Sequence, residues 1–239
     1  MKLLLSALCI VLLATTCMNP FNKTIRGNGN ITTSQRNISS VQRVKCAGNY
    51  NVQLTQGSPV SVKIEADENL QPHIITDVNG DELSIHSEHD INLDPTQKIK
   101  IYITTDKLEG FQLNGSGDVN TTNKFTDGDH LDLGIAGSGN IHFDVNTPEI
   151  NSSISGTGDI YLSGETRDSK INIAGNGNYH ADDLKSENVK IEIAGNGDAH
   201  LFADSTLDIH IAGVGNVYYK GNASITQNIA GTGKITKEE

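Results

Sequence analysis

The chain has 239 residues, a formal net charge of -11 at pH 7, 24 glycines, no tryptophan and an aromatic content of 5%. This length fits one domain of ordinary size, but the chain lacks the bulky residues that a compact globule favours. The acidic balance disfavours nucleic acid and anionic membrane surfaces as partners through charge alone, so we expect no nucleic-acid binding.

Residues 1–16 have the pattern of an export signal. Lys2 supplies a positive start, and the apolar run at residues 3–13 is far too short to span a bilayer. Cys17 follows directly, and a cysteine in that place can be the lipid-modified first residue of a bacterial lipoprotein. The alternative is ordinary cleavage nearby, because the preceding Ala-Thr-Thr departs from the usual lipobox. We therefore expect an exported cell-envelope protein, an outer-membrane lipoprotein that contacts the membrane through its lipid anchor alone.

The next two segments differ in their patterns. Residues 17–37 are rich in Asn, Thr and Ser with little apolar periodicity, which is typical of a tether. Residues 38–106 alternate between apolar and polar side chains in several short runs, and the Asn-Gly-Asp step at 79–81 predicts a hairpin with at least one antiparallel strand pair. Cys46 lies in one of these runs, and we expect it to be buried in a strand, with no intramolecular disulfide.

Residues 107–239 are organised by a repeated phrase: Gly, any residue, Gly, then Asn or Asp, usually followed by an apolar residue. Successive copies begin 18 to 22 residues apart, and a regular period near twenty is the signature of a solenoid. The phrase begins at Gly115, Gly137, Gly156, Gly175, Gly195, Gly213 and Gly231, and an isolated earlier copy begins at Gly27.

Apolar residues occupy fixed places around each first glycine. They predominate two and four residues before it and four and six residues after it. Because alternate side chains of a strand point to opposite faces, these places form the inward faces of two short strands joined by the Gly-x-Gly corner. In the last copy the inward places include Gln227 and Lys237. The expected fold is an all-β solenoid over 107–239, with a less regular β section at 38–106.

The fourth residue of the phrase alternates between carboxylate and amide along the chain. Two carboxylates on neighbouring coils, ~4.8 Å apart, would repel by roughly 1 kcal/mol in water, and the alternation separates them. Stacked Asn and Asp side chains can also hydrogen-bond to corner amides, so we interpret the column as structural. Calcium is the alternative, but calcium-binding β-rolls have a shorter period with Asp in nearly every turn. The column consists of Asp118, Asn140, Asp159, Asn178, Asp198, Asn216 and Lys234.

An outward column five residues after the first glycine places imidazole or phenol rings on five consecutive coils. Aromatic rings can stack on sugar faces, and His and Tyr can hydrogen-bond to hydroxyls, so this column is a candidate ligand-binding strip. The competing interpretation is structural, since cross-strand ring pairs stabilise a solvent-facing sheet by ~0.2 to 1 kcal/mol each. A transition-metal site at its histidines is a further alternative, although the repeat places no carboxylates around them. The strip consists of His142, Tyr161, His180, His200 and Tyr218.

An enzyme is the alternative to a binding protein, because polysaccharide lyases and hydrolases use solenoid folds of this kind. They need a cluster of acids on one face, often with Arg or Lys. The best candidate is a charged segment at 182–192, but its charges also suit a solvated turn, and Arg167 is the one arginine after Arg43. We therefore predict no catalytic residues, no cofactor and no metal. The segment contains Asp182, Asp183, Lys185, Glu187, Lys190 and Glu192.

The chain resembles a known family of bacterial envelope proteins. The resemblance is carried by the repeated corners, such as GSGDV and AGNGN, together with VQLTQGSPVSVKIEADENL, a DVNGDELSIHS hairpin and KIKIYITTDKLEGFQLNGSGDV. These segments are similar to the putative auto-transporter adhesin head domain, the GIN domain, over roughly residues 38–225. The resemblance implies a right-handed parallel β-helix like that of pectin lyase, found in exported or lipid-anchored proteins of Bacteroidetes. It also implies an adhesive role without established catalytic residues.

Together these patterns predict a non-catalytic binding or adhesion module on an exported, lipid-anchored protein. Surface glycans and host or matrix proteins are the expected partners. A purely structural envelope component and a polysaccharide-active β-helix enzyme are the alternatives.

Overall fold

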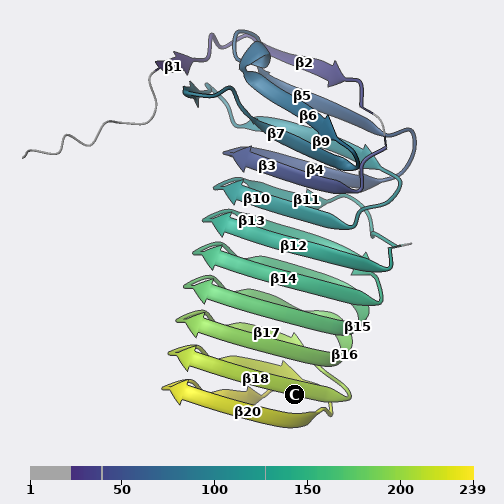
Figure 1. The fold of residues 1–239 in the computed structure, drawn as a ribbon, viewed down its shortest axis with the longest axis vertical. Coiled ribbons are helices and arrows are strands. Elements are labelled where there is room, and N and C mark those ends of the chain that lie inside the picture. The colour runs from purple at the N-terminus through teal and green to yellow at the C-terminus, as the bar shows by residue number, and fades with distance from the viewer. Residues whose placement is uncertain (1–22, 39, 127) are drawn as a thin grey trace, which may run out of the picture.

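The protein folds as a rod of stacked β-coils whose N-terminal end is closed by less regular strands (Figure 1). The computed structural model describes residues 23–38, 40–126 and 128–239. Within these residues the one helical element is the 3₁₀ turn η1 (Gln71–His73), and no helix has the length and apolar character needed to cross a membrane. The export segment 1–16 and Cys17 lie outside the described residues.

Each regular coil consists of two strands that meet at a Gly-x-Gly corner. Equivalent strands of successive coils pair in parallel with their first glycines opposite one another, so two sheets run along the rod and the parallel β-helix expected from the sequence is confirmed. The first sheet contains β10 (Gly110–Gly115), β12 (His130–Gly137), β14 (Glu149–Gly156), the second halves of β15 (Ile160–Gly175) and β16 (Tyr179–Gly195), β18 (Thr206–Gly213) and β20 (Ser224–Gly231). The second sheet contains β11 (Asp118–Thr121), β13 (Asn140–Asn146), the first halves of β15 and β16, β17 (Ala199–Phe202), β19 (Val217–Lys220) and β21 (Ile235–Lys237).

The core lies between the two sheets and follows the inward columns predicted from the repeat. Ile154, Ile173 and Ile193, on consecutive coils, are each 1% exposed. Ser152 puts a buried polar side chain in an inward column, and its hydroxyl lies 3.3 Å from the Tyr179 hydroxyl, within hydrogen-bonding reach. This contact pairs two hydroxyl groups that the apolar core would otherwise leave without a partner. Burial raises the pKa of Tyr179 to about 12, so its hydroxyl keeps its proton.

The predicted inward columns hold only in part in the last coil, where Ile229 and Ile235 pack against the core. Gln227 and Lys237 fall in these columns but are exposed, and Ile225 is 38% exposed. The reason is that β20 and β21 each pair with a strand on one side, so within the described chain their inner faces are covered from that side alone. Polar residues at inward places suit a terminal coil that meets solvent.

The N-terminal section supplies one regular coil that is out of sequence order. β3 (Arg43–Gly48) and β4 (Tyr50–Gln56) pair in parallel with β10 and β11 on one side and with β7 (Glu82–Ser87) and β9 (Ile99–Thr105) on the other. Gly48 lies opposite Gly115, so the glycine column begins here. The repeat search missed this corner because Tyr50 takes the place of the second glycine. Cys46, in β3, is a fully buried free thiol, as predicted.

Antiparallel strands close this end of the rod. β6 (Ile74–Asn79) and β7 form the hairpin predicted at 79–81, with a φ of 65° at Gly80. β5 (Ser61–Asp67) lies antiparallel between β9 and β2 (Ile31–Arg36). A separate two-stranded sheet pairs β1 (Lys23–Arg26) in parallel with β8 (Ile91–Asp94).

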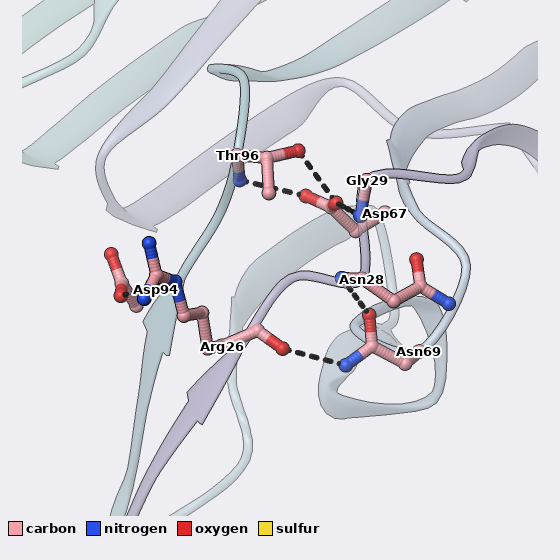
Figure 2. A network of polar contacts seen from close by, with 7 residues as sticks. All are labelled: Arg26, Asn28, Gly29, Asp67, Asn69, Asp94 and Thr96. Carbon is pink, nitrogen blue, oxygen red and sulfur yellow. Dashed lines mark hydrogen bonds and ion pairs between the residues drawn. The ribbon is translucent and has the colours of Figure 1, made fainter.

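The tether predicted at 17–37 is wrong over residues 23–36, where β1 and β2 belong to the folded cap. Residues 17–22 lie outside the described residues. The Thr and Ile residues of β1 and β2 favour extended backbone, and the sequence pattern alone does not show which strands they pair with. The loop between them is fixed by Asn69, which donates to the Arg26 carbonyl and accepts from the Asn28 N–H, both at 2.8 Å (Figure 2). The isolated phrase at Gly27 therefore forms this loop and not a coil corner.

The same loop wraps around the buried carboxylate of Asp67 (Figure 2). Asp67 accepts hydrogen bonds from the Gly29 N–H at 2.7 Å, the Thr96 N–H at 2.9 Å and the Thr96 hydroxyl at 2.7 Å. A Cβ at Gly27 would collide with this carboxylate. Burial raises the pKa of Asp67, but the hydrogen bonds from Thr96 and Gly29 outweigh burial and hold the pKa below its usual value. The ionised carboxylate thus joins the β1–β2 loop to the β8–β9 loop.

We expect Asp67→Asn to lower the free energy of unfolding at pH 7 by about 1 to 3 kcal/mol, because an amide cannot accept from the same three donors. The carboxylate's contribution is fully present above its unfolded pKa of about 3.9 and is lost as pH falls through the lower folded pKa. Urea unfolding at a series of pH values should therefore show the difference from the wild type closing below about pH 3.9. Asp129→Asn, at a side chain that is 96% exposed, is the control. A difference that stays constant with pH would contradict this role.

Candidate binding strip

The five predicted ring residues lie on the outer face of the second sheet, on consecutive coils. β13 carries His142, β15 carries Tyr161, β16 carries His180, β17 carries His200 and β19 carries Tyr218. Each lies directly opposite the next in the strand register. The structure thus brings all five together as one continuous column, which we call the ring strip.

The rings of the ring strip stack face to face. The ring centroids are 4.3 Å apart for His142 and Tyr161, 4.5 Å for Tyr161 and His180, 5.5 Å for His180 and His200, and 4.7 Å for His200 and Tyr218, with interplanar angles from 3° to 14°. Neighbouring rings therefore cover one another's faces and turn their edges outward, where His200 Nδ1 lies 3.7 Å from a carboxylate oxygen of Glu238. The sequence rationale of sugar stacking on ring faces does not apply inside the strip, whereas hydrogen bonding by ring nitrogens and hydroxyls does.

One flank of the ring strip is the alternating Asp/Asn column at the corner, and it forms a hydrogen-bonded ladder. Asn178 Nδ2 and the Asn178 backbone N–H both donate to Asp159 Oδ1, at 3.1 and 2.7 Å. Asn178 Oδ1 in turn accepts from the backbone N–H of Asp198 at 3.1 Å. Asn216 makes the same two donations to Asp198. The structural interpretation of this column is confirmed, and the amide of each Asn accounts for the alternation because it donates to the carboxylate of the preceding coil.

The other flank begins as a shallow hollow of about 290 Å³ that His142, Tyr161 and His180 line. Asp144, Asp182 and Asp183 line it together with these three rings. Two lysines approach the same carboxylates: Lys124 Nζ lies 3.4 Å from Asp144, and Lys220 Nζ lies 3.3 Å from Asp182. The first three rings of the strip therefore have carboxylates on both sides.

The protonation of the central rings follows from their surroundings. Burial lowers the pKa of His180, and His200 and His142 lower it further, although Asp159 and Asp182 act in the opposite direction. Neutral His180 therefore has one ring nitrogen that donates and one that accepts at pH 7. Burial likewise raises the pKa of the Tyr161 hydroxyl, which keeps its proton and can donate. The middle of the strip is thus uncharged and can both donate and accept hydrogen bonds.

The metal alternatives gain no support from this geometry. In the part of the chain that the structure describes, no three His, Cys, Asp or Glu side chains are grouped so that they could hold a metal ion. His180 and His200 meet through their faces, which does not point their nitrogens at a common centre. The corner carboxylates of Asp159 and Asp198, considered for calcium, accept hydrogen bonds from the next coil.

The charged segment considered for catalysis is divided among three surfaces. Two of its residues line the hollow beside the ring strip, and two line a separate hollow at the next corner. The last two form the ion pair Lys190–Glu192, at 2.9 Å, on the outer face of the first sheet. The division arises because β16 continues through this segment around the coil, so residues close in sequence face different directions. The segment therefore does not present the group of acids on one face that such chemistry needs.

Two further sets of amide–carboxylate contacts escaped the sequence analysis. Near the start of the first strands, Asn151 Nδ2 donates to Asp132 Oδ1 at 3.0 Å, and in a separate column Asn188 Nδ2 donates to Asp168 Oδ1 at 2.9 Å. The Thr206 hydroxyl extends the second column by donating to Asn188 Oδ1 at 2.9 Å. Comparing the places five and seven residues before each first glycine would have shown these pairs, whose outward side chains stabilise the register at the opposite corner.

The fold and the ring strip define a parallel β-solenoid that presents registered columns of polar and aromatic side chains. The chain belongs to the family described as "Putative auto-transporter adhesin, head GIN domain", whose model matches residues 41–223. This match confirms the resemblance found in the sequence. Among proteins with curated descriptions, none matches the chain.

Solved structures from Bacteroides and Parabacteroides species have the same fold. A putative adhesin from Bacteroides fragilis is 25% identical, with a TM-score of 0.83 over 90% of this chain and 100% of that one. A putative lipid binding protein from Parabacteroides distasonis is 27% identical, with a TM-score of 0.75 over 91% of this chain and 100% of that one. A putative adhesin from Parabacteroides merdae, at 24% identity and a TM-score of 0.73, shares the fold. The family is thus named for adhesion, and the two neighbours at 25% identity or more are named for adhesion and lipid binding.

We expect Asn178→Asp to lower the free energy of unfolding by about 1 to 3 kcal/mol at neutral pH. The change removes the Nδ2 donor and puts a carboxylate between Asp159 and Asp198, so that three successive coils carry negative charge at the corner. Urea unfolding measures the loss, and added salt should reduce it because the repulsion is screened. Asn228→Asp, the same change at an exposed place in β20, should cost less than about 0.5 kcal/mol. Equal losses for the two variants would count against the ladder.

Proposed function

We propose that the chain is a non-catalytic adhesion module of the bacterial cell envelope, and that the ring strip is its ligand-binding face. The observation that carries the proposal is the column of five stacked rings on consecutive coils of a protein in a family named for adhesins. Surface glycans and host or matrix proteins are the proposed partners. The ring edges, with carboxylates on both flanks, offer the donors and acceptors that such ligands need.

The space between the two sheets is filled by side chains, so a ligand would have to bind on an outer face of the solenoid. One structural neighbour is described as a lipid binding protein. In this chain, however, side chains fill the space between the sheets: Ile173 and Ile193 are each 1% exposed. The outer face of the first sheet has a column of alanines at this level, including Ala174, Ala194 and Ala212. The ring strip, by contrast, is a column of stacked polar rings on five consecutive coils, and we therefore assign binding to it.

We also propose that the protein is exported to the outer membrane and held there by lipid on Cys17. Cys17 precedes Lys23, the first residue of β1, by a few residues, so a lipid at that place would keep the capped end of the rod beside the membrane. The ring strip begins at His142, well along the rod from the cap (Figure 1). Such an orientation leaves the strip open to ligands outside the membrane.

A binding screen against arrayed glycans and matrix proteins tests the adhesion proposal. The wild type should be captured, and a variant with Tyr161, His180 and His200 changed to Ser should lose capture while keeping its far-ultraviolet spectrum. The matched control changes Asn172, Glu192 and His210 to Ser on the outer face of the first sheet, and it should bind like the wild type. Equal capture by both variants would contradict the role of the ring strip. Release of unsaturated or reducing ends from uronic-acid polysaccharides would instead show an enzyme.

Metabolic labelling with a palmitate analogue in a bacterial host tests the anchor. The wild type should carry the label and sediment with the outer membrane. Cys17→Ala should carry none and appear in the soluble envelope fraction. A wild-type protein without label would contradict lipid anchoring and leave the ring strip proposal unaffected.

A further inference from the structure

The ring strip repeats its polar groups at the spacing of the coils. Each of five coils adds one imidazole or phenol edge, and neighbouring strands of a sheet lie ~4.8 Å apart. The centroid distances of 4.3 to 5.5 Å follow this spacing. Because each ring is held between its neighbours, the array is fixed before any ligand arrives, and little side-chain freedom is lost on binding. A ligand that matches the array must therefore repeat along the rod axis.

The chemistry of the flanks points to a ligand with many hydroxyl groups. Neutral His180 and the protonated Tyr161 hydroxyl both donate and accept at pH 7. Ser163, Asp144 and Asp183 line the hollow beside them, so a hydroxyl placed there can donate to a carboxylate while accepting from a ring. Paired donors and acceptors of this kind are what the hydroxyls of a sugar require.

The acidic side chains beside the ring strip favour an uncharged polymer over an acidic one. Asp159 and Asp198 stand on the corner flank, and Asp144, Asp182 and Asp183 stand on the other. The whole chain carries a net charge of -11. Lys124 and Lys220 partly offset Asp144 and Asp182. An acidic polymer would still be repelled by Asp159, Asp183 and Asp198, whereas an uncharged polymer would not.

The geometry also favours a glycan over a peptide. An extended peptide advances about 3.3 Å per residue and presents alternate side chains to a surface, so its repeat does not match the coil spacing. Peptide strands gain affinity chiefly by pairing with a free sheet edge. The ring strip lies across the middle of the sheet, where both edges of each strand are already paired. One pyranose in an extended β-1,4-linked chain, by contrast, adds a length close to one coil.

We infer that the ring strip binds a linear, uncharged, extended β-1,4-linked glycan that runs parallel to the solenoid axis, with one sugar beside each of the five coils from His142 to Tyr218. The inference rests on the binding role proposed above and specifies its ligand class. Recognition is through hydroxyls that contact ring edges and flanking carboxylates, and not through sugar faces stacked on rings.

Titration calorimetry of the full chain with oligosaccharides of increasing length tests the inference. The probes are β-1,4-linked gluco-, manno- and N-acetylglucosamine oligomers. For at least one series, affinity should rise with each added sugar up to five and change less than about twofold beyond that. Oligogalacturonates of the same lengths should bind at least about tenfold more weakly. The inference is overturned if no neutral series shows this length dependence, or if the acidic series binds as well as the neutral one.

Two conservative variants separate hydrogen bonding from stacking. Tyr161→Phe and His180→Phe keep a flat ring in the stack but remove its polar edge. Each should weaken binding of the five-sugar oligomer by about tenfold or more while leaving the melting temperature close to that of the wild type. His210→Phe, on the outer face of β18, is the matched control and should not change affinity. Wild-type affinity in both ring variants would overturn the inference.

The outcomes distinguish this inference from the broader proposal. If the triple serine variant loses capture in the binding screen but no neutral oligomer shows length dependence, the ring strip binds another ligand and the glycan inference fails alone. If the triple serine variant is captured like the wild type, the adhesion role of the strip fails, and the glycan inference fails with it.

Discussion

The structure depends on the close stacking of successive glycine corners. From Gly137 onward, the residue after each first glycine donates its backbone N–H to the first glycine carbonyl of the preceding coil, as Asn176 does to Gly156 and Asn196 does to Gly175, each at 2.9 Å. A Cβ at Gly175 would collide with the Gly156 carbonyl, and the φ of 140° at Gly175 is one that other residues rarely adopt. Glycine is therefore required at the corner if the coils are to approach to strand spacing.

Everything beyond the corner takes its register from it. A slip of one residue would turn each side chain to the opposite face, so a corner of constant length keeps isoleucines inward and rings outward on every coil. The Asp/Asn ladder adds side-chain hydrogen bonds at the same level, joining Asn178 to Asp159 and Asn216 to Asp198. Stacking fixes the rings and exposes their edges at once. The structural and the binding interpretations of the ring strip are thus compatible, because the contacts that stabilise the sheet also arrange its polar groups for a repeating ligand.

The repeated features of the solenoid could be predicted from the sequence, whereas the features that occur once could not. Period, inward columns and ring column follow from alternation and spacing, and Ile154, Ile173 and Ile193 are buried accordingly. The coil formed by β3 and β4 was missed because its partners, β7 and β10, lie far apart along the chain, and strand patterns do not reveal pairing. The exposure of Gln227 arises from its place at the end of the stack. The orientation of the rings could also not be predicted from the sequence, because a column of aromatic residues can present either its ring faces or its ring edges to solvent.

Nuclear magnetic resonance of the His180 ring protons tests most directly whether the glycine corner sets the ring strip. In the wild type these protons should resonate upfield of those of a free imidazole, because the Tyr161 ring lies stacked 4.5 Å away. Gly177→Ala, whose Cβ would collide with the Gly158 carbonyl, should move them toward the free value in the folded protein. Gly57→Ala, where the nearest atom to a Cβ would be 3.6 Å away, should leave them unchanged. Wild-type shifts in folded Gly177→Ala would contradict the dependence of the ring strip on the corner.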